Sequence, residues 1–101
     1  MLYATVLLFG REGGAEGFHA YEEKALAIFR KHGGTVVAAY APKPDAARAE
    51  SPDEIQFLVI ADSAAFDRFL KDPARTALAS ERDAVIRKTE VFLSERAVSY
   101  G

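Results

Sequence analysis

The sequence predicts an α+β fold in which one antiparallel β-sheet carries all of the helices on one of its two faces. The spacing of apolar residues changes along the chain in the order strand, helix, strand, strand, helix, strand. The first strand, residues 2–9, is apolar on both faces except at Tyr3 and Thr5, which is typical of a central strand covered on both sides. With 101 residues, 50% of them hydrophobic, the chain can form one core, and we expect a single domain over residues 1–101.

Charge and composition exclude several classes of partner. The 13 basic and 15 acidic residues give a net charge of −2 and form no basic stripe, so we expect no binding to nucleic acid or to a membrane. Cysteine is absent, which removes disulfides, thiolate nucleophiles and cysteine-ligated metals. Met1 leads directly into the first strand without the basic region of a secretory signal, and this predicts a cytoplasmic protein.

The first strand ends in a turn at residues 10–14, and an amphipathic helix follows. Five apolar residues at helical spacing form its buried face: Phe18, Tyr21, Ala25, Ile28 and Phe29. The residues expected on its other sides are Glu16, His19, Glu22, Glu23, Arg30 and Lys31. Gly33 and Gly34 offer the left-handed conformation that ends many helices. Residues 35–41 are β-branched, aromatic and small, and they predict a second strand that ends at Pro42.

The second half of the chain repeats this order. Residues 42–53 are rich in proline and charge and predict an exposed connection, and residues 54–60 predict the third strand. A cap at Asp62 or Ser63 begins a short helix, whose expected buried residues are Phe66, Phe69 and Leu70. Asp72-Pro73 starts a second helical segment, expected over residues 74–87, and residues 89–93 predict the last strand.

This β-α-β-β-α-β order is that of the ferredoxin-like fold, which leaves one face of its antiparallel sheet bare. Each large apolar side chain left in water costs about 1.5–3 kcal/mol, whereas a whole domain is stable by only about 5–15 kcal/mol. Two copies packed face to face about a two-fold axis would cover both sheets. We therefore expect a homodimer that associates through its sheet faces.

Several short stretches of this sequence resemble a known superfamily. They are Tyr21-Glu22-Glu23-Lys24-Ala25 leading to His32-Gly33-Gly34, then Pro52-Asp53-Glu54-Ile55, Ala65-Phe66 to Lys71-Asp72-Pro73, and Thr89-Glu90-Val91. Together with the element order, they resemble the dimeric α+β barrel superfamily, and within it the uncharacterised thirteen-thirty domain of unknown function. That superfamily includes cofactor-independent monooxygenases, muconolactone isomerases, heme-binding chlorite dismutases and stress-related proteins. None of their catalytic residues can be placed on this sequence, and we carry none over.

The two histidines offer little for catalysis or metal binding. His19 and Glu23 are four residues apart on the first helix, a spacing that suits either an acid–base pair or a solvated helix flank. His32 is either a base or a cation at the helix end. The two histidines lie more than three helical turns apart, so they cannot share a metal within one copy. We expect neither a metal nor another cofactor.

Polar residues on otherwise apolar strands are the candidates for a ligand site. The candidates for ligand binding are Tyr3, Thr5, Gln56, Glu90 and Phe92. These candidates would share a cavity on the other face if the side chains that point toward the helices are the apolar sets Ala4/Val6/Leu8, Ile55/Phe57/Val59 and Val91/Leu93. The alternative is that Gln56 and Glu90 form structural hydrogen bonds near strand ends or at the dimer interface.

Three functions remain open. The first is a homodimeric barrel that binds a small, largely apolar molecule, with any reaction unassigned. The second is a cofactor-independent monooxygenase or isomerase acting on a small aromatic or lactone, in which Glu90 or His32 moves the proton. The third is a structural or assembly domain whose cavity is filled by its own side chains.

Overall fold

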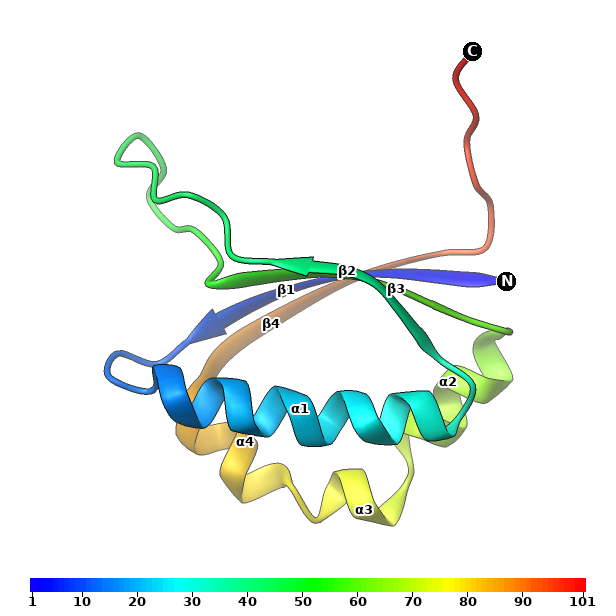
Figure 1. The fold of residues 1–101 in the computed structure, drawn as a ribbon, viewed down its shortest axis with the longest axis horizontal. Coiled ribbons are helices and arrows are strands. Elements are labelled where there is room, and N and C mark those ends of the chain that lie inside the picture. The colour runs from blue at the N-terminus through cyan, green and yellow to red at the C-terminus, as the bar shows by residue number, and fades with distance from the viewer.

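The predicted α+β fold is confirmed. The structure is a computed structural model that describes residues 1–101. Its elements, in chain order, are β1 (Leu2–Gly10), α1 (Ala15–Lys31), β2 (Thr35–Tyr40), β3 (Glu54–Ile60), α2 (Ser63–Leu70), α3 (Pro73–Thr76), α4 (Ala79–Val85) and β4 (Ile86–Ser94). All four helices lie on one side of the sheet, as Figure 1 shows. No helix is long and apolar enough to cross a membrane.

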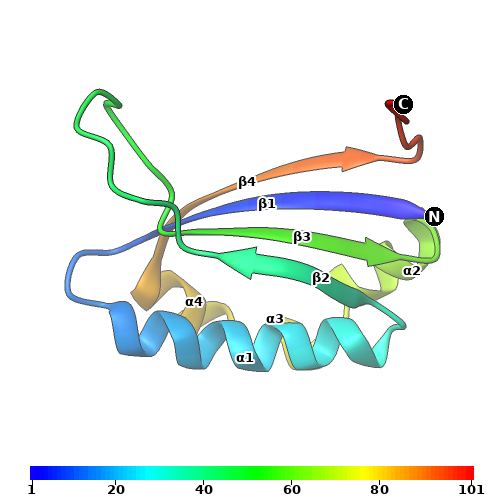
Figure 2. The ribbon, with the colours of Figure 1, turned by 45° about the horizontal axis from the view of Figure 1, so that its top comes forward.

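The sheet has the strand order β2-β3-β1-β4, and every neighbouring pair is antiparallel (Figure 2). β1 is therefore a central strand, as its two apolar faces predict. Leu8 and Phe9, which point to opposite faces, are both buried. The register places Leu58 of β3 opposite Ala4 of β1, and Leu93 of β4 on its other side.

The core lies between the sheet and the helices and consists of two clusters. One cluster joins Leu2, Ala4, Leu58 and Ile60 of the sheet to Phe29, which is fully buried. The buried residues of the other cluster are Leu8, Phe18, Tyr21, Ala25, Val85 and Ile86. The partly buried side chain of Val6 packs against both clusters, so the helix layer is attached along most of β1.

Local sequence signals explain where the helices begin and end. Gly33 has φ +86°, the left-handed conformation that stops α1. The Asp62 side chain accepts a hydrogen bond from the Ala65 N–H and caps α2, and Asp72 accepts one from the Ala74 N–H and caps α3.

The last helical segment and the last strand differ from their predicted limits. The helix expected over residues 74–87 is two short helices, α3 and α4, and the second ends at Val85. β4 begins at Ile86, three residues before the predicted start, because the buried Ile86 pairs with Gly10 across a register shift in β1. Leu70, expected in the core, is exposed at the end of α2.

The predicted orientation of β3 is wrong. Gln56, Leu58 and Ile60 face the helices and are buried, so Ile55, Phe57 and Val59 face the other way. The strand is apolar on both faces apart from Gln56, so its composition does not distinguish the two orientations. The predictions for β1 and β4 are consistent with the register, since Val91 pairs with Val6 and Leu93 with Ala4 on the helix side.

The face of the sheet opposite the helices is called the open face below. It carries Tyr3, Thr5, Leu7 and Phe9 of β1 and the residues paired with them. Several large side chains there are exposed, including Tyr40 at 48% and Phe92 at 60%. The rings of Tyr40 and Phe57 pack together with centroids 5.8 Å apart. No part of the same chain covers these exposed side chains.

The connection over residues 42–53 is almost entirely exposed, as predicted, but its last part is attached to the sheet. The Glu50 carboxylate pairs with Arg87 Nη2 at 2.6 Å and with Lys88 Nζ at 2.9 Å. Lys88 Nζ also lies 4.3 Å from the centroid of the Phe9 ring. These contacts help to explain why Phe9 is buried although it belongs to the open face.

Candidate ligand cavity between the sheet and the helices

A cavity of about 100 Å³ lies between the helix side of the sheet and the helices. Its walls are mostly hydrophobic, with contributions from Val6, Leu8, Leu58, Phe66 and Phe69 among others. The polar residues that line it are Tyr21, Glu22, Gln56, Arg75, Arg82 and Thr89. An apolar enclosure with a few convergent polar groups is the usual form of a small-molecule site.

Glu22 is the central polar residue of this cavity. It lies on α1 four residues after Phe18 and three before Ala25, so the helix places it on the same face as these buried side chains. Only 7% of the residue is exposed. Gln56 Nε2 donates a hydrogen bond of 2.8 Å to Glu22 Oε1, which compensates for part of the cost of burial.

Gln56 is held by carboxylates on two sides. Its Nε2 also donates to Glu54 Oε2 at 2.7 Å, so both of its amide hydrogens have acceptors. Glu22 Oε2 and Gln56 Oε1 have no hydrogen-bond partner within the chain. Every side-chain nitrogen or oxygen that is sealed from solvent does have a partner. The two oxygens must therefore reach space that water can enter, and both residues line the cavity.

The surroundings of Glu22 favour its neutral form. Burial raises the pKa of the Glu22 carboxyl above its ordinary value, and the neighbouring Glu54 carboxylate adds to the increase. The hydrogen bond from Gln56 and the charges of Arg82 and Arg75 act in the opposite direction but do not cancel it. A carboxyl with a raised pKa in an apolar cavity is a candidate for accepting or donating a proton.

Two arginines complete the polar part of the wall. Arg82 Nη2 donates to Thr89 Oγ1 at 2.7 Å, which joins α4 to β4 beside the cavity. The Arg75 guanidinium lies 5.2 Å from the centroid of the Phe69 ring, and its Nη1 donates to the Leu70 carbonyl. Burial raises the pKa of the nearby Tyr21 phenol, and the carboxylate of Glu22 adds to this effect.

An open groove of about 500 Å³ lies outside the cavity, between α1 and β2. Its lining residues are His19, Glu22, Glu23, Leu26, Arg30, Val36, Ala39 and Glu54. Glu22 and Leu26 line both the groove and the cavity. These two residues of α1 therefore form the wall between the interior and the solvent.

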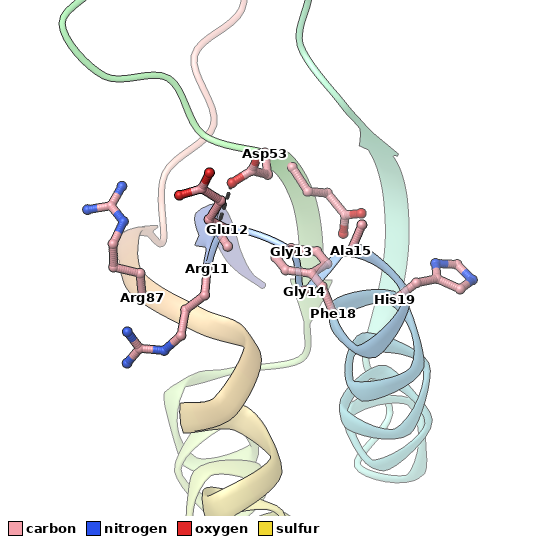
Figure 3. Close-up of a pocket in the computed structure, with 11 residues that line it drawn as sticks. Arg11, Glu12, Gly13, Gly14, Ala15, Phe18, His19, Asp53 and Arg87 are labelled. Atoms are coloured by element: carbon pink, nitrogen blue, oxygen red, sulfur yellow. Dashed lines mark hydrogen bonds between the residues drawn. The ribbon is translucent and has the colours of Figure 1, made fainter.

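A larger hollow of about 740 Å³ lies at the turn between β1 and α1, shown in Figure 3. Only two of its 11 lining residues are hydrophobic. Its polar groups are largely engaged, since Asp53 Oδ2 accepts from the Gly10 N–H at 2.7 Å and Arg11 Nε donates to the Asp83 carbonyl. We rank it below the smaller cavity because it has few apolar walls.

The residues predicted from the sequence are divided between two faces. Tyr3, Thr5, Glu90 and Phe92 share the open face, whereas Gln56 faces the helices and lines the cavity. The expectation that all five residues share one site is therefore wrong for Gln56. Glu90 is partly exposed and its Oε1 lies 3.3 Å from Lys88 Nζ, so within one copy it belongs to an ion pair. A ligand-binding role for the other four stays a prediction.

The two histidines lie outside the cavity. His32 Nε2 is hydrogen-bonded to Asp72 Oδ2 at 2.7 Å, which joins the end of α1 to the cap of α3. This hydrogen bond and the one from the Ala74 N–H lower the pKa of the Asp72 carboxyl. His19 Nε2 lies 3.1 Å from Glu23 Oε1 on an exposed flank of α1.

Solved structures with this fold come from several bacteria. A protein of unknown function from Rhodopseudomonas palustris is 19% identical, with a TM-score of 0.82 over 97% of this chain and 83% of its own. An uncharacterised NIPSNAP domain protein from Burkholderia xenovorans is 15% identical, with a TM-score of 0.71 over 100% and 99%. SnoaB, a cofactor-independent oxygenase from Streptomyces nogalater, is 20% identical, with a TM-score of 0.69 over 97% and 95%.

These likenesses show that the chain shares the α+β fold of these proteins. No family model and no curated protein sequence matches the chain. The resemblance to the thirteen-thirty domain is not confirmed by them.

Proposed function

We propose that this protein is a homodimeric α+β barrel that binds a small, largely apolar molecule carrying a hydroxyl group, with the hydroxyl directed at Glu22. The observation that carries the proposal is the Glu22 carboxyl, which is 7% exposed, lines an apolar cavity and has only one oxygen hydrogen-bonded within the chain. Its other oxygen reaches space that water can enter. A ligand hydroxyl would replace water as the partner of that oxygen.

The polar atoms of the cavity select the kind of ligand. When Glu22 is ionised, Glu22 Oε2 and Gln56 Oε1 are both acceptors, so they favour a group that donates a hydrogen bond. The hydrophobic walls of the cavity favour a ligand whose remaining atoms are apolar. A phenol or an enol combines a hydrogen-bond donor with such an apolar part.

The size of the cavity sets how deeply such a molecule is held. A volume of about 100 Å³ is smaller than the roughly 150 Å³ that accommodates benzene. We therefore place the hydroxyl and its nearest atoms in the cavity and the rest of the ligand in the groove between α1 and β2. Leu26 would move aside, since it separates the two spaces.

The dimer is proposed because the open face is apolar and uncovered. Tyr3, Tyr40, Phe57 and Phe92 are exposed there, and a second copy would bury them by packing sheet against sheet. Light scattering at micromolar concentration measures this directly. A well-folded monomer would refute the dimer without affecting the cavity.

A matched pair of probes tests the ligand class. 4-Ethylphenol donates a hydrogen bond, whereas 4-ethyltoluene, with a methyl group of nearly the same size in place of the hydroxyl, cannot. We expect the phenol to bind at least about tenfold more tightly, since each 1.4 kcal/mol is a factor of ten. NMR titration would provide both affinities and show whether the shifted amides surround Glu22.

Two variants on the same helix provide the control. Glu22→Gln replaces the acceptor in the cavity and should remove most of the preference for the phenol. Glu16→Gln makes the same change at an exposed position of α1 that lines neither the cavity nor the groove, and it should leave the preference intact. Equal binding of both probes, or binding of neither, would refute the proposed ligand class, and the second result would favour a structural domain.

An oxygenase that needs no cofactor is the second candidate. The raised pKa of Glu22 would let its carboxylate take the proton of a bound phenol, and a phenolate is more readily oxidised by dioxygen. The likeness to SnoaB is consistent with this function. Oxygen uptake with 1-naphthol is the test: we expect uptake by the unmodified protein and by Glu16→Gln, and none by Glu22→Gln. Equal uptake by all three would exclude Glu22 as the base.

A further inference from the structure

Two segments project from the open face of the sheet, at opposite ends of it. One is the connection over residues 41–53, and the other is the C-terminal segment, residues 95–101 (Figure 1). In the rotated view of Figure 2 both still lie on the side away from the helices. Together they flank the apolar surface that carries Phe57 and Phe92.

The C-terminal segment is almost unsupported by its own chain. Its hydrogen bonds are those between Ser63 Oγ and Glu95 Oε1 and between Ser94 and Arg96. Val98 and Tyr100 are 64% and 91% exposed. Because they are two residues apart, an extended chain directs both to the same side. The segment therefore offers apolar side chains that nothing in one copy covers.

The sheet alone is small for a stable interface. Four strands about 4.8 Å apart, each about seven residues long at roughly 3.3 Å per residue, cover a flat footprint of roughly 450 Å². Two copies would then bury about 900 Å², whereas stable interfaces bury about 1,200–2,000 Å². Contacts from outside the sheet would bring the interface into that range.

We propose that the C-terminal segment of each copy packs against the other copy, with Val98 and Tyr100 as its main contacts, and that residues 41–53 extend the same interface at the opposite end. This inference depends on the dimer proposed above. Packed sheets lie about 10 Å apart, and seven extended residues span up to about 23 Å. The segment is therefore long enough to pass the edge of the partner sheet.

The charges of the two projections favour a second copy over a foreign partner. Residues 41–53 carry Lys43 and Arg48 together with acidic residues, and the C-terminal segment carries Glu95 and Arg96. A two-fold interface brings the same surface of each copy together, so it must be self-complementary. Neighbouring charges of both signs meet this requirement, whereas a patch of one sign would repel its copy.

Removal of residues 96–101 is the first test. The truncated chain keeps Glu95 and its hydrogen bond with Ser63, so its fold should be intact by circular dichroism. We expect the dimer dissociation constant from analytical ultracentrifugation to rise at least about tenfold. If the full chain is a monomer, the proposed dimer itself fails. If the full chain is a dimer and truncation leaves the constant unchanged, only the role of the C-terminal segment is refuted.

Photo-crosslinking is the second test. The chain has no cysteine, so a Val98→Cys variant can carry a single benzophenone maleimide. We expect illumination to join two copies, and mass spectrometry of mixed isotope-labelled and unlabelled protein to show labelled–unlabelled pairs. Ser80→Cys, at an exposed position on α4, is the control and should give few such pairs. Crosslinks confined to one copy would refute the inference.

Discussion

Glu22 is the residue whose protonation should dominate the pH dependence of stability. Burial raises its folded pKa above the unfolded value of about 4.3. The associated stability is complete below that unfolded value and is lost as pH rises through the folded pKa. Glu22→Gln keeps an acceptor for Gln56 Nε2 and has no charge to bury. We expect the variant to be about 1 kcal/mol more stable than the unmodified protein at pH 8 and equal to it near pH 4.

Urea unfolding between pH 4 and pH 8 measures this difference. The control is Glu23→Gln, because that carboxyl is exposed and pairs only with His19. A Glu22→Gln variant that is less stable than the unmodified protein at pH 8 would show that the arginines, and not burial, govern this carboxyl.

Asp72 should show the opposite pH dependence. Its pKa is lowered by the hydrogen bond from His32 and by that from the Ala74 N–H. A lowered folded pKa contributes stability above the unfolded value, and this is lost as pH falls through the folded one. We expect Asp72→Asn to lower Tm by several degrees at neutral pH, with the deficit shrinking in acid. Asp67→Asn, at an exposed carboxyl near Lys71, should lower it much less.

The position of Glu22 could have been predicted from the sequence. Its spacing of four from Phe18 and of seven from Phe29 places it on the apolar stripe of α1, not on the polar sides. A carboxylate on such a stripe indicates a buried partner or a site. The partner was harder to predict, since Gln56 reaches Glu22 only because β3 turns that face toward α1.

At the scale of single elements, the sequence predicts the place of a strand or the end of a helix best where a distinctive residue or pattern marks it. The central place of β1 follows from its two apolar faces, and the helix ends follow from Gly33, Asp62 and Asp72. The orientation of β3 did not follow, because Phe57 and Leu58 are equally apolar and the choice between them is made by pairing with β1.

The connection between α1 and β2 depends on a glycine that has no room for a side chain. A Cβ at Gly34 would overlap the ring of Phe29, which is fully buried. We expect Gly34→Ala to lower the free energy of unfolding by about 1–3 kcal/mol, the usual cost of overpacking a core. Chemical denaturation measures it. In a Phe29→Leu background the same change should cost less, and strict additivity would contradict the proposed overlap.

At the scale of the whole molecule, the sheet divides two kinds of apolar surface. One side carries the four helices, the core and the cavity, and the other carries no helix. The apolar residues on both faces of β1 indicate this division in the sequence. The projecting segments could not be predicted in this way, since their direction depends on how β2 and β4 end and how β3 begins.

Substitutions at two adjacent residues of β3 can distinguish the roles of the two faces of the sheet. Phe57 is 37% exposed on the open face, whereas Leu58 is 6% exposed in the core. A glutamate at position 58 would be a buried and unpaired charge, so Leu58→Glu should unfold the protein or lower its stability by about 3–5 kcal/mol. Phe57→Glu should keep the fold, because water solvates the open face of one copy, but it should abolish the dimer, because two glutamates would be buried at the interface.

Circular dichroism and light scattering at the same concentration distinguish the two effects. The expected result is an unfolded Leu58→Glu variant and a folded, monomeric Phe57→Glu variant. If the Phe57→Glu variant remains a dimer, the interface does not lie on the open face of the sheet. Any contact of the C-terminal segment with a second copy would then be independent of sheet packing. Since residues two apart share a face, Val59→Glu should repeat the result of Phe57→Glu, whereas Ile60→Glu should repeat that of Leu58→Glu. Alternation along four consecutive positions would arise only from a sheet that is covered by helices on one side and by a second copy on the other.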